Sequence, residues 1–211
     1  MSKQEDSEGV MLFNGKNLDG WKGDFKVWSV EDGCIVGRNT DEYKVMQNTF
    51  LIHEHEYSNF EFTFQYKIIG GNSGVQYRAK VLDEKLFVVG GYQADIEAGI
   101  SYSGILYEEK GRGIMANRGE RVVISEHGEK EITKFSNSED VQNKIRQEAW
   151  NDYKIIARGN HLQHFINNTK TIDVTDNEAG KKASSGIVAL QVHSGSNMTV
   201  YFKNLKIRTY N

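Results

Sequence analysis

Hydrophobic and polar residues alternate strictly along residues 59–68 of this chain. A period of two is typical of a β-strand that turns one face to a core and the other to water. The hydrophobic face carries Phe60, Phe62, Phe64, Tyr66 and Ile68. The segment runs into a glycine-rich turn at residues 70–74, where a permissive backbone is needed. We therefore expect this aromatic stripe to lie in the core of a β-sheet protein.

Three more segments alternate in the same way, but their polar faces carry unusual residue types. They lie at residues 74–80, 90–97 and 188–193. Their polar faces carry Gln76 and Arg78, then Gln93, Asp95 and Glu97, and finally Gln191 and His193. A face that only meets water usually carries Lys, Glu, Thr and Ser, whereas amide, carboxylate, guanidinium and imidazole groups suit recognition of hydroxyl groups. The pattern favours a polar groove for a hydroxyl-rich ligand, and three ordinary amphipathic strands are the alternative.

The remaining segments also consist mainly of strand patterns separated by turn residues. Further strands are predicted at residues 27–30, 34–37, 49–53, 121–126, 153–158, 161–166, 170–174 and 199–208. Gly159 and Asn160 join two of them in a tight hairpin. Ser136 and Glu139 form a capping box before Val141, which predicts one short helix within a loop. We predict an all-β fold in which two antiparallel sheets pack face to face.

Length and composition agree with this prediction. The 211 residues include 10 Tyr, 10 Phe and 3 Trp, enough for a substantial core in a single domain. We expect that domain to span residues 11–211, and the polar, charged residues 1–10 to be a disordered N-terminal segment. This segment lacks the apolar core of a signal peptide. Either it begins a cytoplasmic protein, or it is the tether that remains after an export signal is removed.

Charge and hydropathy exclude two kinds of partner. The net charge is −3 without any basic stripe, which argues against nucleic-acid binding. No apolar run reaches the ~20 residues of a membrane span. Cys34 is the only cysteine, so the fold has no internal disulfide, and its apolar neighbours indicate a buried thiol. The sequence leaves the oligomeric state open.

Familiar catalytic motifs are absent, but one segment concentrates reactive side chains. The sequence has no phosphate-binding loop, nucleophile elbow or HExxH zinc motif. Residues 103–113 place Tyr107, Glu108, Glu109 and Arg112 among glycines, so we expect a loop here. Loops that project from a rigid sheet often carry catalytic groups. A charged surface loop is the alternative interpretation.

Six short motifs in a fixed order resemble the 3-keto-disaccharide hydrolase domain family. They lie at residues 14–21, 71–78, 91–96, 104–109 with Arg112, 150–153 and 186–195, and residues 202–207 close the series. Each motif is weak alone, but together they extend over residues 11–208. The resemblance implies a jelly roll of the concanavalin-A-like, laminin-G-like type, with a carbohydrate site on its concave sheet.

The resemblance also implies a reaction. Such enzymes act on glycosides oxidised to a ketone at sugar carbon 3, which acidifies the proton on carbon 2. A base removes that proton, the group on carbon 1 leaves, and water can add to the unsaturated keto-sugar. We therefore expect a periplasmic or secreted bacterial hydrolase or lyase that cleaves 3-keto-glycosides by elimination. A non-catalytic carbohydrate-binding module on the same fold is the alternative.

The polar faces and the matched motifs supply the candidate site residues. The catalytic candidates are His193, Asp95, Glu108 and Tyr107. The substrate-binding candidates are Asn72, Gln76, Arg78, Gln93, Glu97, Arg112 and Gln191.

Several roles within this set stay open. His193 is the favoured base because an imidazole titrates near neutrality, with Asp95 and Glu108 as the other candidates. Tyr107 or Arg112 is expected to steady the developing negative charge. Arg78 either binds sugar or forms an ion pair with Asp95. A divalent metal held by His193 with Asp95 or Glu108 is a further option, and no other cofactor is expected.

Overall fold

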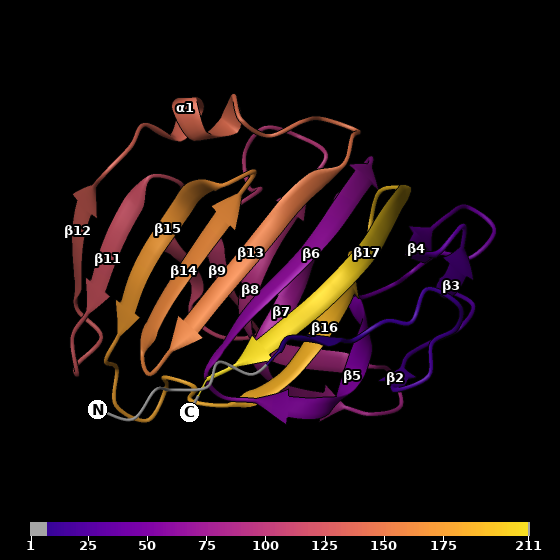
Figure 1. Cartoon of the computed structure of the whole chain (residues 1–211), viewed down its shortest axis with the longest axis horizontal. Helices are drawn as coiled ribbons and strands as arrows, with labels where there is room; N and C mark the ends of the chain where they lie inside the picture. The colour runs from indigo at the N-terminus through magenta and orange to yellow at the C-terminus, as the bar shows by residue number, and fades with distance from the viewer. Residues whose placement is uncertain (1–7, 211) are drawn as a thin grey trace.

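The computed structural model describes residues 8–210 and contains two β-sheets packed face to face (Figure 1). In spatial order, the large sheet consists of β12 (Lys130–Lys134), β11 (Glu120–Ile124), β15 (Thr169–Asp176), β14 (His161–Ile166), β13 (Asn151–Arg158), β6 (Phe60–Ile69), β17 (Met198–Thr209), β4 (Cys34–Asn39) and β3 (Trp28–Glu31), with β1 (Val10–Met11) paired to β17. The small sheet consists of β10 (Gly113–Ala116), β9 (Leu106–Glu109), β8 (Val88–Glu97), β7 (Asn72–Asp83), β16 (Gly186–Val192), β5 (Thr49–Tyr57) and β2 (Trp21–Lys22).

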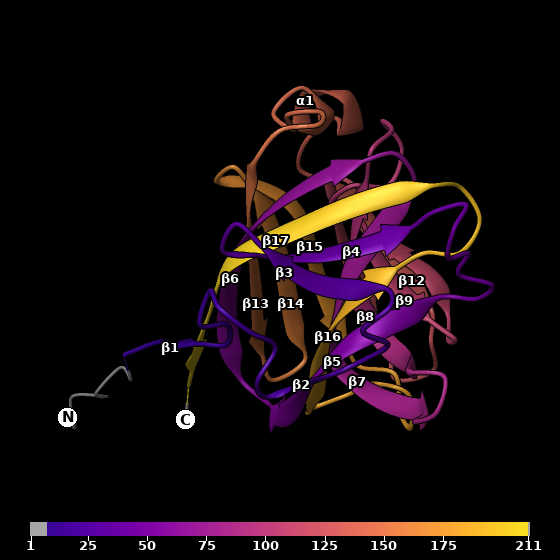
Figure 2. The same cartoon turned by 90° about the vertical axis from the view of Figure 1, so that its right-hand side faces the viewer.

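The predicted jelly-roll sandwich is confirmed. The strand pairs are antiparallel, except that β11 and β15 pair in parallel. Figure 2 shows the two sheets from the side, as separate layers, with the short helix at one end. Most of the hydrophobic core lies between these layers.

The predicted aromatic stripe is part of that core. Its residues Phe60, Phe62, Phe64, Tyr66 and Ile68 are each at most 4% exposed. They alternate on β6 with half-buried polar residues, as the period of two requires. From the small sheet, the ring of Tyr77 approaches that of Phe60 to 6.1 Å. The two sheets are therefore held together by large interlocking rings.

The predicted helix is present, but its cap lies one residue further along. Helix α1 spans Ser138–Gln142, and the side chain of Asn137 accepts the Glu139 N–H at 3.0 Å. Asparagine caps a helix as well as serine does, so the later residue takes the place expected for Ser136. Among residues 8–210 no helix is long and apolar enough to span a membrane.

Several regions differ from the predicted elements. Most of the predicted loop at residues 103–113 forms β9, the turn after it and the start of β10. Strand β12 was not predicted, because all five of its residues are exposed and no hydrophobic face marks it. Of the predicted N-terminal segment, residues 1–7 lie outside the described part, and Val10 already pairs with Ile207 of β17.

The outer face of the small sheet is partly covered by its own hairpin. Residue Phe87, between β7 and β8, packs on a small apolar cluster there. That cluster consists of Phe50, Ile52, Ala79, Val89, Ile187 and Ala189. Beyond it, the same face carries Gln76 of β7, Gln93 and Asp95 of β8, and Gln191 of β16.

Candidate functional site

A cavity of about 300 Å³ opens on the outer face of the small sheet. The predicted site residues that line it are Asn72, Gln93, Asp95, Tyr107, Gln191 and His193. Residues not predicted that also line it are Asn48, Tyr102, Ile105, Glu109 and Ile114. The polar faces of separate segments therefore come together as expected, because β8, β7 and β16 are neighbours in the sheet.

Three glutamine amides form the floor beside Asp95. The Gln93 Oε1 atom accepts a hydrogen bond from Gln76 Nε2 at 2.7 Å and another from Gln191 Nε2 at 3.1 Å. An amide oxygen only accepts, so with these two bonds formed the other end of the Gln93 amide points to Asp95. That end is Nε2, which donates to Asp95 Oδ1. Gln76 is fully buried and supports Gln93, instead of lining the cavity as predicted for a substrate-binding residue.

The absence of a side chain at Gly74 leaves space for the Gln93 amide. A Cβ atom at Gly74 would lie 2.7 Å from Cδ of Gln93 and 2.9 Å from its Nε2. Real atoms do not approach so closely, so any other residue would push the Gln93 amide away from its partners. The glycine that precedes Gln76 in the second motif thus leaves room for the floor of the site.

Asp95 is a buried carboxyl group with unusual acidity. It is 6% exposed, and its burial raises the pKa to about 7. The hydrogen bond from Gln93 works in the opposite direction, whereas the negative charges of Glu109 and Glu97 raise the pKa further. Near neutral pH, Asp95 is therefore able both to hold and to release a proton, as a general acid or base must.

His193 follows β16 and is held in a defined tautomer. Its Nδ1 atom lies 2.5 Å from the carbonyl oxygen of Ser194, and an oxygen of this kind only accepts. The proton of the neutral ring is therefore on Nδ1, which leaves the lone pair on Nε2. Asn48 steadies this turn by accepting the Ser194 N–H at 3.1 Å, and its amide donates to Glu109 at 3.3 Å.

Asp95 and His193 flank the cavity from opposite sides. Asp95 lies on β8 and His193 directly after β16, and β7 runs between these strands. Neighbouring strands are about 4.8 Å apart, so the two backbones are separated by roughly twice that distance. This arrangement places two proton-transfer groups around one space, which Asn72 of β7 also lines.

Tyr107 lies on the Asp95 side of the cavity. Its backbone pairs with Gln93, so both side chains emerge on the outer face. Burial raises the pKa of its hydroxyl, and the charges of Glu109 and Asp95 add to this effect. Tyr107 therefore remains a hydrogen-bond donor at neutral pH.

Glu108 and Arg112 lie outside this cavity, contrary to prediction. Because residues 106–109 form a strand, Glu108 points to the opposite face from its neighbours Tyr107 and Glu109. There Glu108 accepts Arg112 Nε at 2.6 Å, and Arg112 also binds Asp176 at 2.7 Å. Glu109 is the carboxylate of this segment that lines the cavity, and treating the segment as a strand would have identified it.

Arg78 also lies outside this cavity. The pairing of β7 with β8 shifts between Tyr77 and Lys80, and Arg78 adopts a positive φ of 47°. This bulge breaks the alternation on which the prediction rested. The Arg78 guanidinium is buried and donates to the carbonyl oxygens of Ser58 at 2.8 Å and Gly159 at 2.6 Å. Arg78 forms no ion pair with Asp95, and it lines a separate hollow together with Glu108 and Arg112.

Arg78→Lys is expected to lower the free energy of unfolding by about 1.5–3 kcal/mol. A lysine ammonium cannot reach the separate carbonyl groups that the guanidinium fork binds. The midpoint of urea denaturation measures this loss, and kcat/KM should stay unchanged where the variant is folded. Unchanged stability together with weakened substrate binding would contradict the structural role.

Glu97 binds the backbone of a loop at the rim of the cavity. Its carboxylate accepts the backbone N–H groups of Ser101 at 2.9 Å and Tyr102 at 2.7 Å. It borders an adjoining hollow that also contacts Asn72 and His193. Glu97 therefore holds the loop that carries Tyr102 into the cavity wall.

The described residues do not assemble a metal site. Within residues 8–210, no three His, Cys, Asp or Glu side chains gather closely enough to hold a metal ion. His193 and Asp95 share the cavity, but Glu108 lies on the other face of β9.

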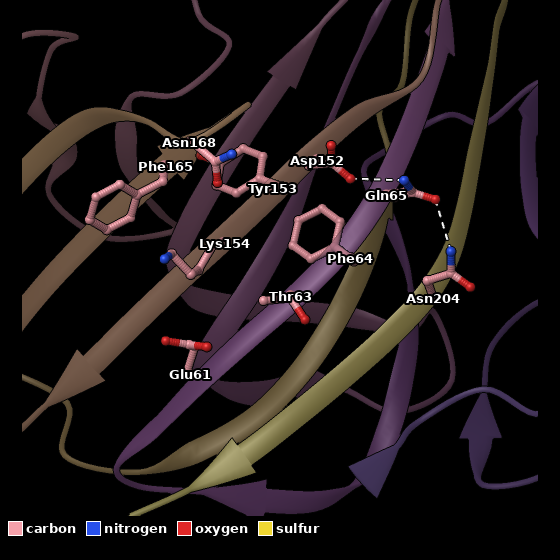
Figure 3. Close-up of a pocket in the computed structure, with 10 residues that line it drawn as sticks. All are labelled: Glu61, Thr63, Phe64, Gln65, Asp152, Tyr153, Lys154, Phe165, Asn168 and Asn204. Atoms are coloured by element: carbon pink, nitrogen blue, oxygen red, sulfur yellow. Dashed lines mark hydrogen bonds between the residues drawn. The ribbon is translucent and has the colours of Figure 1, made fainter. Parts of the chain in front are cut away.

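A second hollow, of about 410 Å³, lies on the outer face of the large sheet (Figure 3). Thr63 lies between Phe165 and a hydrogen-bonded row of side chains. In that row Asn204 donates to Gln65, and Gln65 donates to Asp152, both at 2.8 Å. None of the predicted site residues lines this hollow. We therefore place the candidate site on the small sheet.

Comparison with solved structures shows the shared fold. A candidate glycosyl hydrolase from Parabacteroides distasonis ATCC 8503 is 22% identical, with a TM-score of 0.63 over 96% of this chain and 94% of that one. The carbohydrate-binding module CBM66 from Bacillus subtilis is 17% identical, with a TM-score of 0.56 over 90% of this chain and 96% of that one. A lichenase from a mouse hindgut metagenome is 9% identical, with a TM-score of 0.52 over 96% and 98%.

A comparison of the sequence with family profiles shows the family. No curated protein matches the chain. The sequence profile of the 3-keto-alpha-glucoside-1,2-lyase-like domain matches residues 8–208. This range contains all the motifs from which the resemblance was inferred, and every residue of the cavity. The chain therefore belongs to the 3-keto-alpha-glucoside-1,2-lyase-like domain family.

Proposed function

We propose that this protein is a carbohydrate-active enzyme that cleaves 3-keto-glycosides by elimination across sugar carbons 1 and 2. The family supports the substrate class. The observation that carries the reaction is the placement of Asp95 and His193 around one cavity, since the elimination needs a base and an acid at neighbouring atoms. A lyase releases the unsaturated keto-sugar, and a hydrolase adds water to it.

His193 is the proposed base. The lone pair of Nε2 takes the proton from carbon 2, and the electrons of that C–H bond move to the oxygen of the 3-ketone as an enolate. Asn72 and the hydroxyl of Tyr107 are uncharged donors in the cavity wall, and we assign them to this oxyanion. The enolate electrons then return to form the carbon 1–carbon 2 double bond as the leaving group departs.

Asp95 is the proposed acid. Its raised pKa leaves a proton on the carboxyl group in a substantial fraction of molecules at pH 7. That proton passes to the oxygen that leaves carbon 1, so the departing group is a neutral alcohol. Addition of water to carbon 1, with a proton returned to carbon 2, completes hydrolysis and restores both groups.

The floor of the cavity contains an unpaired hydrogen-bond acceptor that suits a sugar hydroxyl. The Oε1 atom of Gln191 is buried without a hydrogen-bond partner among the described residues, and Gln191 lines the cavity. A buried acceptor left unpaired costs roughly 1–3 kcal/mol. A ligand hydroxyl that donates to this oxygen would remove that cost. A carbohydrate therefore suits the floor better than an apolar ligand does.

The floor also favours one other function. Neutral amides of Gln93, Gln191 and Asn72 are groups that a binding module uses for hydroxyls, so a non-catalytic carbohydrate-binding domain is the second candidate. Both candidates bind a sugar, and only the enzyme converts it.

A single assay separates the two functions. The protein is incubated with a 3-keto-disaccharide and with the unoxidised parent disaccharide, each with and without a chelator. We expect release of the second sugar from the 3-keto compound alone, unaffected by the chelator. Binding of both compounds without release of sugar would support the binding module instead.

A further inference from the structure

The cavity has two chemically different sides. Asn72, Gln191 and His193, from β7 and from the end of β16, form a polar side. Three further lining residues, Tyr102, Ile105 and Ile114, offer mainly apolar surface, and we call them the apolar wall; Tyr102 also borders the adjoining hollow with Asn72 and His193.

Strand pairing places the apolar wall next to Asp95. Ile114 of the edge strand β10 pairs with Tyr107, and Tyr107 pairs with Gln93 of β8. Directly opposed residues share a face, so these three side chains follow one another from the sheet edge to the floor. Asp95 lies two residues after Gln93 on the same face of β8. The proposed acid therefore lies between the apolar wall and the polar side.

Two of the three residues of the apolar wall leave hydrophobic surface exposed, whereas Ile105 is buried. Tyr102 is 46% exposed and Ile114 is 42% exposed, although both line the cavity. Single exposed hydrophobic residues are common, but a group of them around a polar cavity marks a binding surface. Contact with an apolar ligand would remove this surface from water.

The loop that carries Tyr102 is firmly held. Arg118 donates from Nη2 to the carbonyl oxygen of Ile100 at 2.8 Å, and from Nη1 to that of Ser103 at 3.1 Å. Glu97 accepts the Tyr102 N–H from the other side. The apolar wall is therefore already formed before a ligand binds, which lowers the entropic cost of binding.

We infer that the preferred substrates are 3-keto-glycosides whose leaving group is an aromatic alcohol or phenol, bound against the apolar wall, in place of a second sugar. This inference rests on the proposed function for the reaction, but the binding preference stands without it. Isoleucine side chains offer no hydrogen bonds to the hydroxyls of a leaving sugar, which would lose water without replacement. An aromatic ring has no such groups, and its burial is favourable.

The test compares two leaving groups of similar acidity, so that only apolar contact differs. The substrates are the benzyl and methyl 3-keto-α-glucosides, and the corresponding disaccharide serves as the sugar case. We expect kcat/KM for the benzyl compound to exceed that for the methyl compound roughly 10–100-fold, as an apolar pocket contact allows. Ile114→Asn should reduce this ratio at least about fivefold. Ile132→Asn is the matched control, because Ile132 is a 50% exposed isoleucine of β12 in the large sheet.

A binding experiment distinguishes failure of this inference from failure of the proposed function. Calorimetry with unoxidised benzyl and methyl α-glucosides needs no turnover and should show the same preference, reduced by Ile114→Asn alone. Equal binding and equal kcat/KM for the two compounds would overturn the inference, and so would a clear preference for the disaccharide. An Ile114-dependent benzyl preference without any turnover would support the inference and contradict the proposed reaction.

Discussion

Asp95→Asn is expected to lower the turnover of methyl 3-keto-α-glucoside by roughly 10²–10⁴-fold. The amide keeps the size of the carboxyl group but cannot give a proton to the departing methoxide oxygen. The variant should still exchange the carbon 2 proton with deuterated water, because His193 remains. Loss of exchange together with turnover would make Asp95 the base and contradict our assignment.

A substrate with a better leaving group should selectively restore the activity of Asp95→Asn. A 4-nitrophenyl leaving group departs as a stable anion, so its 3-keto-glucoside should lose far less activity in Asp95→Asn than the methyl compound does. In the wild type, kcat/KM for the methyl compound should fall as the pH rises through about 7, because Asp95 loses the proton that it donates. Equal losses for both leaving groups would exclude Asp95 as the acid.

Asp95 should also make the wild type less stable at high pH. Its folded-state pKa lies above the unfolded value, so its contribution to stability is present below the unfolded pKa and is lost as the pH rises through about 7. Asp95→Asn removes this dependence. We expect the variant to gain about 2–4 kcal/mol of unfolding free energy relative to wild type between pH 5 and pH 8, measured by urea denaturation. A constant difference would show that Asp95 has an ordinary pKa.

His193→Ala is expected to lower turnover of every 3-keto-glycoside by roughly 10²–10⁴-fold, whatever its leaving group. Exchange of the carbon 2 proton should fall in parallel, because the variant has no base in place. His55→Ala is the control, since His55 is an exposed histidine of β5 that does not line the cavity. Rapid exchange in His193→Ala would transfer the role of base to another group.

Much of this site could be predicted from the sequence, because alternation fixes the face of a regular strand. Gln93 and Asp95 share the outer face of β8 with a period of two, and Gln191 and His193 follow the same rule at the end of β16. Pairing of these strands with β7 then brings the residues into one cavity. The stripe on β6 was equally predictable, since its hydrophobic and polar positions alternate without interruption.

The errors arose where the backbone leaves that regular pattern or where sequence carries no signal. A bulge at Arg78 turns its side chain away from the expected face. Glycines at residues 111 and 113 suggested a loop, so Glu108 was chosen where strand alternation selects Glu109. Asn48 reaches the cavity from the segment before β5, and nothing in its local sequence links it to His193 or Glu109.

The fate of the hydrogen on carbon 2 tests the central claim most directly. Methyl 3-keto-α-glucoside labelled with deuterium at carbon 2 is cleaved in ordinary water, and the product is reduced at once with borohydride and analysed by mass spectrometry. Elimination requires the carbon 2 bond to break, so we predict loss of the label and a slower reaction than with the unlabelled compound. Unreacted substrate and added product, kept without enzyme, control for spontaneous exchange. Release of methanol with the label fully retained and with equal rates for labelled and unlabelled substrate would contradict elimination and point to direct hydrolysis at carbon 1.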